Sequence, residues 1–202
     1  MKIGAVKILS REDCYSGFLS LARYHLIHRL FSGGWSRPVV RERLEGLAAV
    51  AILLYDPVRD AVVMVEQFRI GALEEGAGAW LVEPAGGAVE PGEQPADVAV
   101  REAMEETGCG IEALHPIGQV HINPGLAQHR LWMFCGRVDA SKASGIHGVD
   151  EEGEDLRVVV KDADTLINGL FSGEVASATT VLAIQWLERN REMLRGLWSQ
   201  GG

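Results

Sequence analysis

Two apolar segments joined by a short polar turn lie in the first half of the sequence. LAAVAILLY (Leu47–Tyr55) is a continuous apolar run typical of a buried strand, and AVVMVEQF (Ala61–Phe68) has the composition of a second strand. Between them, Asp56-Pro57-Val58-Arg59-Asp60 has the chemistry of a tight turn. The sequence therefore predicts a β-hairpin whose strands must be covered by other elements.

The later elements indicate a mixed α/β fold of the α+β kind. Strand-like segments interleave with helix-like segments at uneven spacing, which favours a layered sandwich over a regular βαβ array. The candidate strands are Ile117–Ile122, Leu131–Val138 and Leu156–Val160, and the candidate helices are Pro95–Thr107 and Ser177–Leu194.

The region before the hairpin is harder to interpret. FLSLARYHLIHRLF (Phe18–Phe31) fits either a helix or an alternating strand, and the polar stretch 32–45 is expected to separate it from the hairpin. We predict a β-rich extension over residues 1–46, followed by the main domain over residues 47–202.

Composition excludes several classes of protein. The 202 residues carry a formal charge of −9, which argues against general nucleic-acid binding, because phosphate contacts need a basic surface. The longest apolar run is too short to span a bilayer, so we expect no membrane contact and a cytoplasmic location. Cys14, Cys109 and Cys135 include no CxxC pair and are interpreted as ordinary small apolar residues.

The helix predicted over Pro95–Thr107 carries two glutamates four residues apart. Glu102 and Glu106 lie on one edge of its apolar stripe, where their like charges destabilise the helix. Arg101 is badly placed to neutralise both, so a divalent ion such as Mg²⁺ or Mn²⁺ is the simplest partner. The alternative is a solvated acidic helix face, and the helix alone does not decide between them.

The residues around this helix follow one spaced pattern from Gly87 to Cys109. Its fixed positions are Gly87, Glu93, Arg101, Glu102, Glu105, Glu106 and Gly108. They match the signature GX5EX7REUXEEXGU, with Ala103 and Cys109 in its two apolar places. The stretch thus resembles the Nudix hydrolases, and the resemblance implies an α/β/α sandwich with a mixed sheet.

The resemblance also implies a reaction and a metal site. Nudix hydrolases cleave the diphosphate of a nucleoside diphosphate linked to another group. The glutamates that match Glu102 and Glu106 bind divalent ions, Glu105 assists, and the backbone carbonyl of Gly86 is a further ligand. Such ions neutralise the diphosphate and lower the pKa of an attacking water.

Arg101 and Glu93 have a supporting role in this resemblance. They are expected to pair and so to hold the loop of the signature against its helix.

Nearly the whole chain resembles the bacterial ADP-ribose pyrophosphatases of Nudix type. Pro124 stands where that group has a marker proline. The other matching segments are EQFR (Glu66–Arg69), SGIHG (Ser144–Gly148), EEGEDLRV (Glu151–Val158) and ASATTVLAIQWL (Ala176–Leu187).

That resemblance implies roles for three further residues. Glu154 would be another metal ligand, Glu152 would activate water from a polar loop that closes over the site, and Arg69 would contact phosphate or ribose. The alternatives are a solvated acidic loop and a surface arginine without function.

One position departs from the subfamily pattern. His129 stands where a glutamate is usual; its ring is able to donate to a phosphate or ribose oxygen but does not replace a carboxylate toward magnesium. The number of metal ions and the sugar preference are therefore left open. The resemblance also implies a homodimer in which the extension lends residues to the partner's site, with Trp35, Tyr24 or Phe31 as candidates to stack on adenine.

These observations lead to one expected activity and several alternatives. The expected activity is hydrolysis of ADP-ribose to AMP and ribose 5-phosphate. Hydrolysis of GDP-mannose or an ADP-sugar is the nearest alternative, and a Nudix-fold ligand sensor without catalysis is a second. In a third, the C-terminal helix docks a partner through Trp186 and Trp198, although Trp186 is more simply a core residue.

Overall fold

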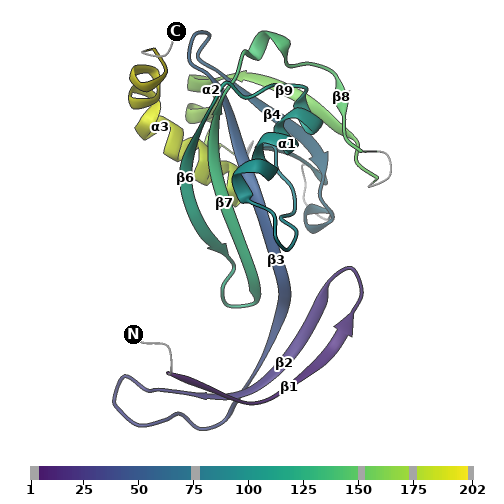
Figure 1. Ribbon diagram of the computed structural model, residues 1–202, viewed down its shortest axis with the longest axis vertical. Coiled ribbons are helices and arrows are strands. Elements are labelled where there is room, and N and C mark those ends of the chain that lie inside the picture. The colour runs from purple at the N-terminus through teal and green to yellow at the C-terminus, as the bar shows by residue number, and fades with distance from the viewer. Residues whose placement is uncertain (1–4, 74–77, 150–152, 173–176, 200–202) are drawn as a thin grey trace. The chain divides into compact units, whose positions relative to one another are not determined.

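The computed structural model describes residues 5–73, 78–149, 153–172 and 177–199, which form nine strands, three α-helices and two short 3₁₀ helices (Figure 1). In chain order they are β1 (Val6–Ser16), β2 (Ser20–His28), β3 (Val39–Asp56), β4 (Ala61–Phe68), η1 (Ile70–Ala72), β5 (Trp80–Glu83), α1 (Pro95–Thr107), β6 (Ala113–Ile122), β7 (Ala127–Arg137), η2 (Ala140–Lys142), β8 (Ile146–His147), β9 (Leu156–Asp162), α2 (Ala163–Gly169) and α3 (Ala178–Ser199).

The strands belong to one sheet with a branched order. Its main path is β1-β2-β3-β4-β9-β8, β5 also pairs with β4, and β7 pairs with both β3 and β6. The pairs β1–β2, β2–β3, β3–β4, β4–β5, β4–β9 and β8–β9 are antiparallel. This mixed α/β architecture confirms the predicted fold class.

The chain divides into two compact units. The first consists of residues 1–48 and 120–131, and the second consists of residues 49–119 and 132–202. The first unit thus includes the turn between β6 and β7 besides the N-terminal strands.

The N-terminal unit is a three-stranded antiparallel arrangement of β1, β2 and the first part of β3. Residues Ser20–Leu26 pair with Val39–Glu45, so the ambiguous segment at 18–31 is mainly a strand. The expectation that 32–45 only separates two elements was wrong for its second half, because β3 already begins at Val39.

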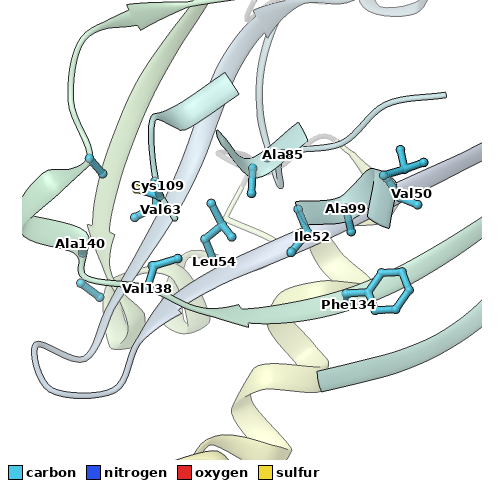
Figure 2. Packing of buried hydrophobic residues seen from close by; sticks show 14 residues of the cluster. Val50, Ile52, Leu54, Val63, Ala85, Ala99, Cys109, Phe134, Val138 and Ala140 are labelled. Carbon is cyan, nitrogen blue, oxygen red and sulfur yellow. The ribbon is translucent and has the colours of Figure 1, made fainter. Parts of the chain in front are cut away.

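The second unit has helices on both faces of its sheet. Alternate residues of β3, Ile52 and Leu54, pack in one core cluster with Ala99 of α1, as Figure 2 shows. Tyr55, which follows Leu54, points to the other face, where its ring lies 6.4 Å from that of Trp198 on α3. Because helices cover both faces, the central strands are apolar without alternation, as the sequence predicts.

The hairpin turn is fixed by a buried carboxylate. Asp56 is 1% exposed, and its Oδ1 accepts hydrogen bonds from the backbone N–H groups of Val58 and Arg59 at 2.9 and 3.0 Å. Its Oδ2 accepts a third from Ala140 at 3.0 Å, and this bond ties the hairpin to η2. The predicted turn is therefore confirmed.

Cys14 and Trp198 differ from or extend what the sequence led us to expect. Cys109 and Cys135 are buried as expected, but Cys14 is exposed. Trp198 is buried against Tyr55, so it packs inside this unit. Among the described residues, no helix is long and apolar enough to cross a membrane.

Candidate active site

The helix that carries the acidic residues, α1, spans Pro95–Thr107 as predicted. Pro95 starts it, where the missing N–H costs no hydrogen bond, and Gly108 ends it in the left-handed conformation with φ of 69°. Its buried stripe contains Val98, Ala99 and Ala103. Val100 lies outside that stripe, because it is 44% exposed.

The side chains of Glu102 and Glu106 on α1 lie against the loop that precedes the helix. Glu106 is only 2% exposed, and its Oε2 accepts a hydrogen bond of 2.8 Å from the backbone N–H of Gly86. The Glu102 carboxylate lies against Gly87 so closely that a Cβ there would come within 2.3 Å of Oε1. A side chain at Gly87 would therefore displace the Glu102 carboxylate from this position.

Burial makes the negative charge of this pair unfavourable. It raises the pKa of Glu106 to about 8, and it also raises the pKa of Glu102. The Glu154 carboxylate adds to both shifts through charge repulsion, so it lies close enough to influence the pair. A cation bound between these oxygens would reverse the effect, and hard oxygen donors suit a divalent ion.

The described residues give only part of a ligand set. Among them, no three His, Cys, Asp or Glu side chains converge tightly enough to hold an ion by themselves. An ion held by Glu102 and Glu106 would complete its shell with carbonyl, water or substrate oxygens, as magnesium often does. The oxygen donors and the mutual repulsion of these buried carboxylates fit a divalent metal.

Arg101 lies among three carboxylates on the outer side of the helix. Its Nη1 is 3.6 Å from Glu93 Oε1, its Nη2 donates to Glu102 Oε1 at 3.1 Å, and its Nε is 3.9 Å from Glu105 Oε2. Arg101 therefore reaches Glu102, which was not expected, whereas none of its described contacts is with Glu106. Glu93 Oε2 also accepts from the N–H of Glu90, which closes the loop.

Arg69 follows β4 and continues its pairing with the neighbouring strand. Its N–H donates to Ala79 at 2.7 Å, and its Nε forms an ion pair of 2.6 Å with Glu83. Its charge lowers the pKa of Glu106, although burial outweighs this effect. Glu83 was not predicted from the sequence. It stands opposite Val65 in the pairing of β4 with β5, so its place beside Arg69 becomes apparent only once the strand register is known.

The acidic loop before β9 is partly described. Glu154 N–H donates to Val149 O at 3.3 Å, and Val149 N–H donates to Glu154 Oε2 at 3.4 Å. Gly148 makes this turn with φ of 114°, and a Cβ there would lie 2.8 Å from Glu154 O. Glu152, the expected water-activating residue, lies outside the described residues.

Pro124 and His129 belong to the other compact unit. Pro124 lies in a turn in which the N–H groups of Leu126 and Ala127 both donate to Asn123 O at 3.0 Å. His129 lies on β7, and burial lowers its pKa, so its ring is neutral near pH 7. Their expected approach to the acidic pair remains a prediction.

The candidate base-stacking residues differ in exposure. Tyr24 is buried, and its hydroxyl donates to Glu45 while accepting from Arg43, so its ring is held inside the N-terminal unit. The Trp35 ring has Lys7 at 4.5 Å and Arg29 at 4.4 Å.

Phe31 is the third candidate, and its side chain is 98% exposed. Exposure leaves Phe31 the most accessible ring of the three.

Comparison with known proteins identifies the class to which this fold and site belong. Residues 46–170 match the model of the NUDIX domain, and the chain belongs to the Nudix family. Members of this family typically use a divalent metal ion.

Individual relatives extend the similarity to nearly the whole chain. It is 41% identical over 194 residues to the ADP-ribose pyrophosphatase of Escherichia coli strain K12, covering 96% of this chain and 93% of the relative. The ADP-ribose pyrophosphatase of Haemophilus influenzae is 39% identical, with 96% and 91% covered.

Two more distant matches complete the comparison. The GDP-mannose pyrophosphatase of Cronobacter sakazakii is 29% identical over 73% of this chain and 74% of that protein. A crystal structure described as an ADP compounds hydrolase has the same fold, with a TM-score of 0.67, 18% identity, and coverage of 94% of this chain and 98% of that one.

Proposed function

We propose that this protein hydrolyses ADP-ribose to AMP and ribose 5-phosphate. The observation that carries the proposal is the 41% identity with an ADP-ribose pyrophosphatase over 96% of this chain and 93% of the relative. In the reaction, water adds to one phosphorus of the diphosphate, the bridging P–O bond breaks, and each product keeps one phosphate.

The metal site of this proposal is centred on α1. Glu102 and Glu106 would hold Mg²⁺, with Mn²⁺ as a substitute, and the Gly86 carbonyl and Glu154 would add ligands. The buried carboxylate of Glu106 and the pKa shifts of the acidic pair support this assignment. Divalent ions bound there supply charge neutralisation of the diphosphate and a lowered pKa for the attacking water.

Other residues are proposed to bind the substrate, to accept a proton or to position the acidic pair. Arg69, beside Glu83 and close enough to influence Glu106, is proposed to bind a diphosphate oxygen. Glu152 is proposed as the base that accepts the proton of water, with Glu105 assisting. Arg101, through its contacts with Glu93 and Glu102, would keep the loop and the acidic pair in register.

The N-terminal unit is proposed to form a homodimer and to contribute to the substrate site. Its strand β1 is an edge strand that is exposed along its whole length and carries apolar side chains such as Ile8 and Leu9. The unpaired N–H and C=O groups of an edge strand can pair with another chain, and exposed apolar side chains favour such contacts. Pro124 and His129 of the same unit would then contact the sugar or phosphate.

Product analysis tests the proposed reaction. Incubation with ADP-ribose and Mg²⁺ should yield AMP and ribose 5-phosphate in equal amounts, and EDTA should stop the reaction. Glu106→Gln should remove turnover while the circular dichroism spectrum stays unchanged. Retained turnover in Glu106→Gln would overturn the metal assignment, and different products from the wild-type protein would overturn the substrate.

Hydrolysis of GDP-mannose is the second candidate. Relatives described as GDP-mannose pyrophosphatases match 73% of this chain, which supports a shared reaction with a different base. A sensor without catalysis is less well supported, because the acidic pair of the signature is complete.

A further inference from the structure

A buried side-chain amide lies on β4 without a partner. Gln67 is 6% exposed, and its Nε2 has no hydrogen-bond acceptor in the described part of the chain. Folded proteins leave few buried donors unpaired, because an unpaired donor loses its hydration without compensation. An acceptor from outside the chain would satisfy it.

Strand geometry shows which way this amide points. Successive side chains of β4 alternate between the faces of the sheet, so Gln67 shares a face with Val63 and Arg69. Val63 packs in the core cluster that includes Ala99 of α1, and Arg69 pairs with Glu83 on the same face. Gln67 therefore lies between the core beneath α1 and the arginine proposed to bind diphosphate.

No hydrogen bond joins Gln67 Nε2 to the described acidic side chains of the site, whose printed donors are other groups. Glu83 Oε2 accepts from Arg69 at 2.6 Å, and Glu106 Oε2 accepts from the Gly86 N–H at 2.8 Å. Across the strand pair, Gln67 stands directly opposite Leu81, which has no side-chain acceptor. Among the described residues, the amide nitrogen of Gln67 thus has no acceptor within hydrogen-bond distance.

We propose that Gln67 positions the substrate by donating a hydrogen bond from Nε2 to an anionic oxygen of the bound diphosphate, next to Arg69. This inference rests on the proposed function and deepens it. Arg69 supplies charge, whereas the neutral amide supplies one directed donor from a rigid strand. Such a donor fixes the rotation of the diphosphate without adding a further buried charge.

The test replaces the amide with an apolar group of similar length. In Gln67→Met, KM for ADP-ribose should rise roughly tenfold or more, as expected for a lost hydrogen bond to a charged group, while kcat changes much less. The Tm should stay equal or increase, because the unpaired donor is gone. Leu81→Met, directly opposite on β5, is the matched packing control and should keep the wild-type KM.

A binding measurement separates this inference from the substrate assignment. The dissociation constant of methylenediphosphonate, measured by calorimetry at saturating Mg²⁺, should rise by a similar factor in Gln67→Met whichever nucleotide sugar the enzyme prefers. An unchanged dissociation constant and KM would overturn the role of Gln67. A Tm clearly below that of Leu81→Met would also overturn it, because the amide would then have an acceptor inside the protein.

Discussion

Replacing Glu106 by glutamine should change how the stability of the metal-free protein depends on pH. The carboxylate is 2% exposed and accepts one hydrogen bond, from the Gly86 N–H at 2.8 Å. Burial and the charges of Glu102 and Glu154 raise its pKa to about 8. Glutamine has nearly the same shape but never ionises, so the variant removes only the proton equilibrium and the charge.

The sign and size of the effect follow from linkage. An ordinary glutamate has a pKa near 4.5, so between that value and about 8 the folded protein holds a proton that the unfolded chain has lost. The free energy of unfolding then falls as pH rises, by about 1.4 kcal/mol per pH unit. From pH 5.5 to 7.0 the loss is about 2 kcal/mol, which corresponds to a fall in Tm of roughly 4–8 °C.

Thermal unfolding in EDTA across this pH range measures the effect. The wild-type Tm should fall with rising pH, and the Tm of Glu106→Gln should fall distinctly less. Saturating Mg²⁺ should restore the Tm of the wild-type protein but not that of the variant. Glu105→Gln is the matched control, because its side chain is 44% exposed. Parallel Tm curves for the wild-type protein and Glu106→Gln would refute the reasoning.

Three further substitutions distinguish effects on catalysis from effects on stability. Gly87→Ala places a Cβ within 2.3 Å of Glu102 Oε1, so kcat/KM should fall by roughly 10–100-fold while the Tm barely changes; unaltered kinetics would contradict the close approach. Gly108→Ala forces a side chain into φ of 69°, and differential scanning calorimetry should show a loss of about 1 kcal/mol. Asp60→Ala removes the acceptor of the Tyr55 hydroxyl and the partner of two α3 arginines, so stability measured in urea should fall by about 2–4 kcal/mol with kcat/KM unchanged.

Elements with strong local signals were predictable to the residue. The helix Pro95–Thr107 has a proline start and a glycine stop, and the strand Ala61–Phe68 follows a clear turn. In contrast, β1 (Val6–Ser16) was not predicted, because all of its residues are exposed and no burial-driven pattern marks them. Strand β5 (Trp80–Glu83) was too short to recognise.

Within the candidate site, contacts between residues close in the sequence could be predicted, whereas contacts between distant residues could not. The i,i+4 spacing of Glu102 and Glu106 was apparent from the helix itself. The contact of Arg69 with Glu83 depends on pairing between two strands, and the approach of Glu154 depends on the path of the chain into β9. Such long-range contacts leave no local pattern.

The most direct test of the central claim compares kcat/KM for ADP-ribose, GDP-mannose and NADH under identical conditions with Mg²⁺. We predict that ADP-ribose is the best of the three by at least tenfold and that EDTA abolishes its hydrolysis. A higher kcat/KM for GDP-mannose or NADH, or undiminished turnover in EDTA, would contradict the account.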